Sequence, residues 1–182
     1  MVMVSSLSGQ TPSFVPGQVL LKFAEGTIGH DAVVAATQSN KVDSDDLASV
    51  ARALGMRTGI PLIPASIGSG YWMVMRVDTV SLLGQVADWL ERRAETRLIE
   101  KHAAGGLTLN LVDSVSASQV AQLVEAWSVG VSVPLNGKLT SPRDLTLSID
   151  HARLTLDLVS RLKALPEVAS VQPNYAQAGP RP

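Results

Sequence analysis

The chain carries one pattern of apolar residues twice, at a spacing of 72 positions. A register that repeats at a fixed offset without gaps is rarely produced by composition alone, so it indicates a duplicated folding unit. The matched pairs are Asp78 and Asp150, Leu82 and Leu154, Val86 and Leu158, Leu90 and Leu162, Glu95 and Glu167, and Ile99 and Val171.

The first strand of each copy matches at a larger spacing, 88 positions. Because the two spacings differ by 16 residues, the first copy is expected to carry 16 extra residues, which we assign to 27–42. This extra segment is expected to form either a helix, within "HDAVVAATQSN", or a mobile loop, and no role is assigned to it. The matched first-strand pairs are Gly17 and Gly105, Val19 and Leu107, Leu21 and Leu109, and Phe23 and Leu111.

Each copy is predicted to follow the order β-α-β-β-α-β. Residues 18–24 alternate in the period of two that is typical of a strand. Residues 43–55 begin with acidic residues and end at a glycine, as helices do. The other elements expected in the first copy are an edge strand or loop at 57–70, a strand at 71–78, a helix at 79–95 and a strand at 96–103. In the second copy we expect strands at 105–113, 143–150 and 166–175, a strand and turn at 129–139, and helices at 116–127 and 153–165.

The fold class that follows is α+β, as two tandem ferredoxin-like βαββαβ units with antiparallel sheets and helices on one face. We expect the first unit at residues 15–104 and the second at 105–176. A flexible N-terminal segment, 1–14, and a flexible tail, 177–182, are expected at the two ends. One enlarged α+β domain is the alternative that the weak identity of the two copies leaves open.

Composition and charge exclude several classes of protein. With 46% apolar and 17% charged residues among 182, most of the chain can bury enough surface to fold. The net charge is −1 and the basic residues are scattered, so we do not expect nucleic acid as a partner. No apolar run approaches the roughly 20 residues that cross a bilayer, and the first residues lack a signal-peptide pattern. We therefore expect a soluble chain without a membrane partner. Its localisation stays open, and secretion is one alternative if the chain derives from a longer precursor.

No group of residues in the sequence indicates catalysis or a metal centre. There is no cysteine, and His30, His102 and His151 are far apart, so each is interpreted as a surface or hydrogen-bonded histidine. Neither a phosphate-binding glycine loop nor a GxSxG elbow is present. The sequence predicts a protein that is not an enzyme and that uses no cofactor and no metal.

Two segments at opposite ends of the chain resemble one known family. "VPGQVLLKF" at 15–23 is similar to the start of the propeptides of subtilisin-type serine proteases, where proline and glycine lead into the first strand. "LKALPEVASVQPNYA" at 162–176 resembles their end, where a helix and a last strand run into Pro-Asn-Tyr. The βαββαβ order between them is the fold that this family implies. One departure is that the front motif falls in the first copy and the end motif in the second.

The resemblance implies a partner, a subtilisin-like serine protease, and a binding mode. The sheet of the second unit would cover two surface helices of the protease, and the tail would lie as an added strand in its substrate groove. The module would act as an inhibitor, a folding chaperone of the protease, or both. The residues that the resemblance assigns to protease binding are Gln172, Pro173, Asn174, Tyr175, Ala176, Gln177 and Ala178.

Other interpretations stay open at this point. Tyr175 can instead pack the last strand against its own sheet. The family places acidic residues near the last strand to cap protease helices, whereas this chain has Gln172 and Asn174 there, so that part of the binding mode is weakened. The alternative function is a non-catalytic ferredoxin-like scaffold for protein–protein interaction or homodimerisation, and the sequence does not fix the oligomeric state.

Overall fold

The computed structural model describes residues 14–102 and 105–175. The fold is α+β, with two antiparallel sheets and helices packed on them, as predicted. In the first part of the chain the elements are β1 (Phe14–Phe23), α1 (Ile28–Ser39), α2 (Asp45–Thr58), β2 (Leu62–Ile67), a short 3-10 helix (Ser69–Tyr71), β3 (Met73–Val77) and α3 (Thr79–Leu90). They are followed by β4 (Thr96–His102), β5 (Gly106–Leu111), α4 (Ala117–Val131), β6 (Leu135–Leu139), β7 (Asp144–Ile149), α5 (His151–Lys163) and β8 (Val168–Tyr175).

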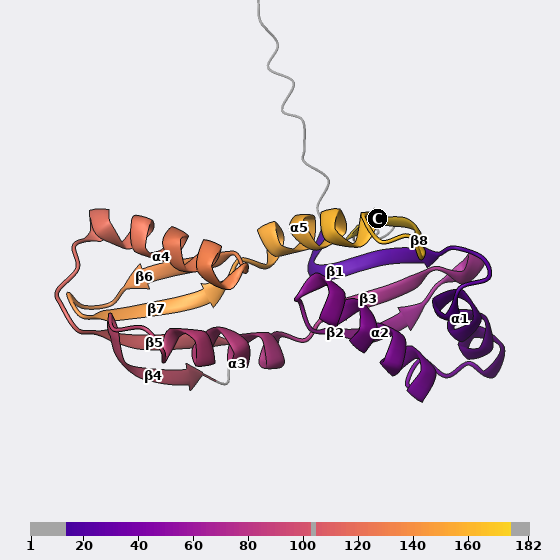
Figure 1. Cartoon of the computed structure of the whole chain (residues 1–182), viewed down its shortest axis with the longest axis horizontal. Coiled ribbons are helices and arrows are strands. Elements are labelled where there is room, and N and C mark those ends of the chain that lie inside the picture. The colour runs from indigo at the N-terminus through magenta and orange to yellow at the C-terminus, as the bar shows by residue number, and fades with distance from the viewer. Residues whose placement is uncertain (1–13, 103–104, 176–182) are drawn as a thin grey trace, which may run out of the picture.

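The strands form two four-stranded sheets of the same design. Sheet A has the order β2-β3-β1-β8, and sheet B has the order β4-β5-β7-β6. In each sheet the first strand of a copy, β1 or β5, lies in the middle, and the last strand of a copy, β8 or β4, lies at one edge. This is the strand order of a ferredoxin-like fold. The two sheets lie side by side along the long axis of the molecule, and two connections run between them (Figure 1).

The pairing of the fourth strands corrects the predicted grouping of the elements. Strand β8 pairs with β1, and β4 pairs with β5. Helix α5 packs on β1 and β8, whereas α3 packs on β4 and β5. Residues 15–104 and 105–176 are therefore not two self-contained units. Each contributes its last helix and its last strand to the other sheet.

We name the two units that the pairing defines. Unit A consists of sheet A with α1, α2 and α5, and unit B consists of sheet B with α3 and α4. Unit B is continuous in sequence, from Thr79 to Ile149, and it separates the two parts of unit A. The sequence could not reveal this exchange because α3–β4 and α5–β8 carry the same apolar register and so fit either sheet.

The exchanged strands occupy equivalent positions in the two sheets. Val171 of β8 pairs with Leu21 of β1, and Ile99 of β4 pairs with Leu109 of β5. Both pairs agree with the spacings of 72 and 88 residues in the sequence. The duplication predicted from apolar register is thus confirmed at the level of strand pairing.

The two crossover points between the units are also equivalent. Asp78 precedes α3 with φ −78° and ψ 87°, and Asp150 precedes α5 with φ −78° and ψ 85°. Each aspartate caps its helix through its side chain, accepting from the backbone N–H of Ser81 or Arg153. Both aspartates donate their own backbone N–H over 2.9 Å to a proline carbonyl, Pro61 or Pro134. The same local structure therefore starts both exchanged helices.

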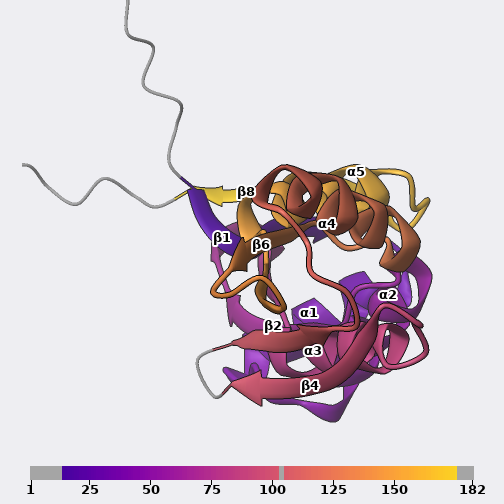
Figure 2. The same ribbon diagram turned by 90° about the vertical axis from the view of Figure 1, so that its left-hand side faces the viewer.

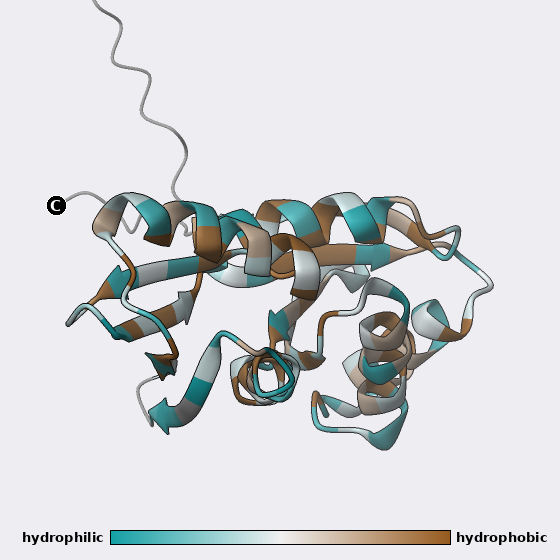
Figure 3. Cartoon of the chain, turned by 60° about the vertical axis from the view of Figure 1, so that its left-hand side comes forward, coloured by the Kyte–Doolittle hydropathy of each residue, from teal (hydrophilic) through white to brown (hydrophobic). Residues whose placement is uncertain are grey.

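The extra residues of the first copy form a helix, α1, which settles the alternative left open by the sequence. Thr27 caps it by accepting from the backbone N–H of His30, and Asn40 ends it in a left-handed conformation. Its buried residues include Ala32, Val33 and Ala36, which join the core of unit A. Figure 3 shows how hydrophobic and hydrophilic residues alternate along this and the other helices.

Helix α5 joins the two units through Arg161. Its guanidinium donates to the Thr58 carbonyl at the end of α2 over 2.7 Å and to the Ser132 carbonyl after α4 over 2.9 Å. It also pairs with Asp157 one turn earlier, over 2.5 Å. Carbonyls at helix ends lack partners within the helix and attract cations. One side chain thus satisfies helix ends that belong to different units.

Candidate functional site

The side of sheet A that the helices leave uncovered has an apolar centre. Strand alternation sends Val19, Leu21 and Phe23 to the helix side and the residues between them to the other side. Leu20 lies there opposite Val74, which is only 9% exposed although it is not part of the helix-covered core. We call this side open face A. Its residues are Gln18, Leu20 and Lys22 of β1, Ile63 and Ser66 of β2, Trp72, Val74 and Arg76 at β3, and Ser170, Gln172 and Asn174 of β8.

On the equivalent side of sheet B, open face B, the side chains that the structure describes are polar. Its described side chains are Thr108 and Asn110 of β5, Asp144, Thr146 and Ser148 of β7, Asn136 and Lys138 of β6, and Glu100 and His102 of β4. Several of these side chains bond to each other, such as His102 with Thr108 over 2.6 Å and Asn110 with Asp144 over 3.0 Å. The hydroxyl of Ser141 and then the amide of Asn110 hold the pKa of the Asp144 carboxyl below its ordinary value. A hydrogen-bonded, charged surface of this kind is typical of a solvated sheet face.

Strand β8 places four of the predicted site residues at the edge of sheet A. Pro173 is buried, Gln172 and Tyr175 are exposed, and Asn174 is half-buried. An edge strand tolerates proline because one of its sides needs no ladder donors. Figure 2 shows β8 beside β1 at this edge. The other three predicted residues, Ala176, Gln177 and Ala178, lie outside the described residues.

Side chains tie the end of β8 to the start of β1. The Asn174 amide donates to the Gln18 side-chain oxygen over 2.8 Å. The ring of Tyr175 meets that of Phe14 edge to face, with centroids 6.5 Å apart. Tyr175 therefore does pack against its own sheet, as the alternative interpretation held, and it keeps 44% of its surface exposed.

The Pro-Gly pair of the front motif lies inside β1, where it contacts α5. Gly17 has φ +80°, and its backbone N–H donates over 2.7 Å to the hydroxyl of the buried Thr155. A Cβ at Gly17 would stand 3.1 Å from Nδ1 of His151. The left-handed φ and this close approach both require glycine. The front motif is thus fitted to the helix that leads into the end motif.

His151 differs from the surface or hydrogen-bonded histidine that the sequence predicted. Its Nδ1 is buried without a hydrogen-bond partner in the part of the chain that the structure describes. It borders a cavity of about 330 Å³ at the end of sheet A, together with Arg76 and Asp78. Burial lowers the pKa of His151, while the neighbouring Asp150 carboxylate opposes this effect. The hydroxyl of Ser81 is the main cause of a lowered pKa at Asp78, and Arg76 adds a smaller contribution.

The charges on open face A are positive. Lys22 is half-buried and Arg76 is exposed, and neither forms an ion pair within residues 14–102 and 105–175. The acidic residue at the start of the end motif, Glu167, lies off this face and pairs with Arg57 of α2. The sequence analysis did not single out the basic pair or the apolar centre, although the alternation of residues 18–24 and 71–78 was the signal that could have found them.

Neither a metal centre nor a membrane span is indicated by the described parts of the chain. No group of three or more histidine, cysteine, aspartate or glutamate side chains within 14–102 and 105–175 is arranged to hold a metal ion. Over the same ranges, each helix is too short or too polar to cross a bilayer.

Comparisons with known proteins do not assign a function, so a functional proposal rests on the surfaces described above. No protein-family model, curated protein or solved structure matches the chain.

Proposed function

We propose that this protein is a propeptide-like module that binds a subtilisin-type serine protease, as an inhibitor, a folding chaperone, or both, without catalytic activity of its own. The observation that carries the proposal is the meeting of the two resembling motifs. "VPGQVLLKF" forms β1 and "PNY" ends β8, and these strands are neighbours in one ferredoxin-like unit. The departure noted in the sequence, with the motifs in different copies, no longer counts against the resemblance.

Open face A supplies the docking surface in this proposal. Leu20 and Trp72, which are half-buried around the buried Val74, give it apolar area that the protease would cover, whereas the described side chains of open face B form no such centre. Exposed apolar surface on one of two duplicated units is a sign of a partner. This moves the docking surface from the second copy, where the sequence analysis placed it, to unit A.

The tail after Tyr175 would enter the substrate groove of the protease as an added strand. Each backbone hydrogen bond in such a groove contributes about 1 kcal/mol, so a few of them bind weakly. Most of the affinity must therefore come from open face A.

The positive charge of open face A gives the proposal a preference among proteases. The acidic residues that would cap the N-termini of protease helices are absent from the described part of this face, whose charged residues are Lys22 and Arg76. Cations are attracted to carboxylates and to helix C-termini and are repelled by helix N-termini. The cognate protease is therefore expected to present acidic side chains opposite these two residues.

The scaffold alternative receives less support. A scaffold that buries its sheets would hold them face to face, but sheets A and B lie side by side along the molecule (Figure 1). Homodimerisation through open face A is tested by sedimentation of the purified protein.

The test is inhibition of a panel of subtilisin-type proteases by the full chain and by a variant that lacks residues 176–182. This cut keeps Pro173, Asn174 and Tyr175, whose contacts with β1 hold sheet A together. We expect slow, tight inhibition by the full chain and a loss of at least about tenfold, about 1.4 kcal/mol, for the variant. Equal inhibition by the full chain and by the shortened variant would show that the tail does not contribute to binding. Rapid digestion of the folded chain by every protease would sink the proposal.

A further inference from the structure

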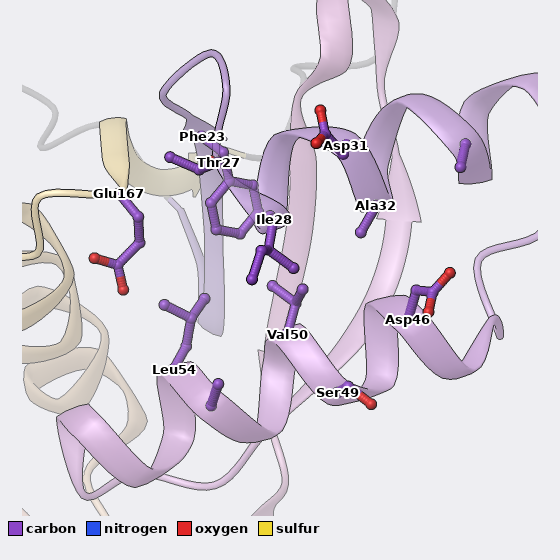
Figure 4. Close-up of a pocket in the computed structure, with 13 residues that line it drawn as sticks. Phe23, Thr27, Ile28, Asp31, Ala32, Asp46, Ser49, Val50, Leu54 and Glu167 are labelled. Carbon is purple, nitrogen blue, oxygen red and sulfur yellow. The ribbon is translucent and has the colours of Figure 1, made fainter.

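The extra helix of unit A creates a groove that unit B does not have. Helices α1 and α2 pack side by side on the helix side of sheet A, away from open face A. Between them lies a cavity of about 660 Å³, within the size range of ligand and peptide sites. Figure 4 shows Ile28 of α1 facing Val50 of α2 across it, with Phe23 behind them.

The groove has an apolar floor, and small side chains line its walls. Phe23, Val50 and Leu54 are buried beneath it, whereas Ala35 and Ala53 line it and are exposed. Small side chains on facing helices allow a third helix to approach closely. Ile28, at the start of α1, is 84% exposed, which is the largest exposure among the large apolar side chains described.

The charges around the groove are acidic. Asp31 and Asp46 line it, together with Glu167, and none of its lining residues is basic. Arg57 compensates Glu167, while Asp31 has only a 3.5 Å contact with His30 and Asp46 forms no ion pair within 14–102 and 105–175. An apolar groove with an acidic border complements an apolar segment flanked by cations.

We propose that the groove between α1 and α2 binds an amphipathic helix of a partner protein that carries a stripe of apolar side chains bordered by lysine or arginine. The length of α2 sets the scale: a bound helix of about 14 residues, roughly 21 Å long, would fill the groove. The apolar side chains of the partner lie over Val50 and Leu54, and its cations face Asp31 and Asp46. The site is independent of open face A, so it stays available while a protease is bound there.

The experiment titrates the full chain with two designed helical peptides of about 14 residues, which share a leucine stripe and carry either lysine or glutamate on the polar side. Binding is followed by the fluorescence anisotropy of labelled peptide. The proposal expects saturable one-to-one binding of the lysine peptide and at least about tenfold weaker binding of the glutamate peptide, about 1.4 kcal/mol. Absence of lysine-peptide binding, or equal binding of both peptides, would overturn it.

Two pairs of variants locate the binding. Ala53→Trp fills the groove and should abolish binding, whereas Ala121→Trp, at an exposed position of α4, should leave it unchanged. The double variant Asp31→Asn/Asp46→Asn should weaken binding of the lysine peptide severalfold, whereas Asp88→Asn on the exposed side of α3 should not. Circular dichroism checks that each variant is folded. Unchanged binding by folded Ala53→Trp would place the peptide elsewhere and refute the proposal.

Sedimentation separates the proposed occupant from a second copy of the chain. A monomer at working concentration agrees with the proposal. A dimer that the substitution Ile28→Asp dissociates would mean that the groove is a self-association surface, and the proposal of a basic partner helix would then be wrong.

Discussion

Sheets A and B share strand order, pairing register and helix caps, yet the central side chains of their open faces differ in character. Leu20 on β1 and Thr108 on β5 occupy the same position of the duplicated unit, 88 residues apart. The first pairs with Val74 and the second with Thr146. In unit B these central positions on the open face hold polar side chains, as expected for a sheet face in contact with water. The apolar residues of open face A are the feature on which we base the proposed docking surface.

The largest change tests whether unit A folds and functions without unit B. Deletion of residues 78–149 joins Val77 to Asp150, and the equivalent conformations of Asp78 and Asp150 make this junction compatible with both β3 and α5. His151 and Val77 already border one cavity, so their ends are close in space. We expect a folded unit A with a lower melting temperature, because the contact of Arg161 with Ser132 is lost.

The shortened protein should keep inhibition of the protease within about tenfold of the full chain. Calorimetry and an inhibition assay measure both quantities. A folded but inactive product would show that unit B takes part in binding, and open face A would then not be sufficient.

A charge placed on each open face in turn should show which of the two faces takes part in inhibition. Leu20→Glu puts a carboxylate in the apolar centre of open face A, where docking would bury it without a partner. We expect at least about 100-fold weaker inhibition, about 2.7 kcal/mol. The matched variant, Thr108→Glu, should change inhibition less than about twofold because open face B stays in water. Similar losses in both variants would contradict the assignment of docking to unit A.

The paired helix caps predict smaller effects. Asp150→Ala and Asp78→Ala each remove a side-chain cap from an equivalent helix start, so each should lower the free energy of unfolding by about 1 kcal/mol. Only Asp150→Ala should also weaken inhibition, since α5 leads directly into β8. Chemical denaturation and the inhibition assay separate the two effects. Weaker inhibition by Asp78→Ala alone would reverse the roles of the units.

The smallest effect expected is a dependence of stability on pH at a position where unit A has a histidine and unit B has none. His151 begins α5, and the equivalent residue of α3 is Thr79. Because the folded state lowers the pKa of His151, the unfolded state binds its proton more readily. Stability from this residue is complete above its ordinary pKa of 6.5 and is lost as the pH falls below that value.

Replacement His151→Gln should flatten the fall in melting temperature between neutral and mildly acidic pH. Thr79→Gln serves as the matched control and should leave the pH dependence of the full chain in place. An unchanged pH profile in His151→Gln would assign the acid sensitivity to other groups.

The local sequence pattern predicted most of the helices and strands, but it assigned the last helix and strand of each copy to the wrong sheet. The alternation of residues 18–24 and the caps and apolar stripes of α3 and α5 predicted strands and helices where they are found. The spacings of 72 and 88 residues predicted the duplication, and the equivalent edge pairs Val171 with Leu21 and Ile99 with Leu109 follow them. The choice of sheet could not be predicted, because two segments with equal register have equal local preference for either partner.

The candidate site was predicted in part for a related reason. Gln172 to Tyr175 were recognised from their resemblance to a known motif, and they do lie at a sheet edge. Open face A was missed, because the apolar residues at Leu20 and Val74 gain meaning only when β1 and β3 are known to be neighbours and the same positions of unit B are known to be polar.

The discontinuity of unit A has a consequence for the order of events during synthesis. All the strands of sheet B emerge from the ribosome before α5, so unit B can close while the chain is still being made. Strand β1 emerges first but obtains its neighbour β8 only after Tyr175 has appeared. Pairings over such a separation form slowly, and an unpaired strand edge is prone to aggregation. The nascent chain therefore carries β1 with one side unsatisfied until β8 has been made, and this is the stage at which a chaperone would have its largest effect on yield.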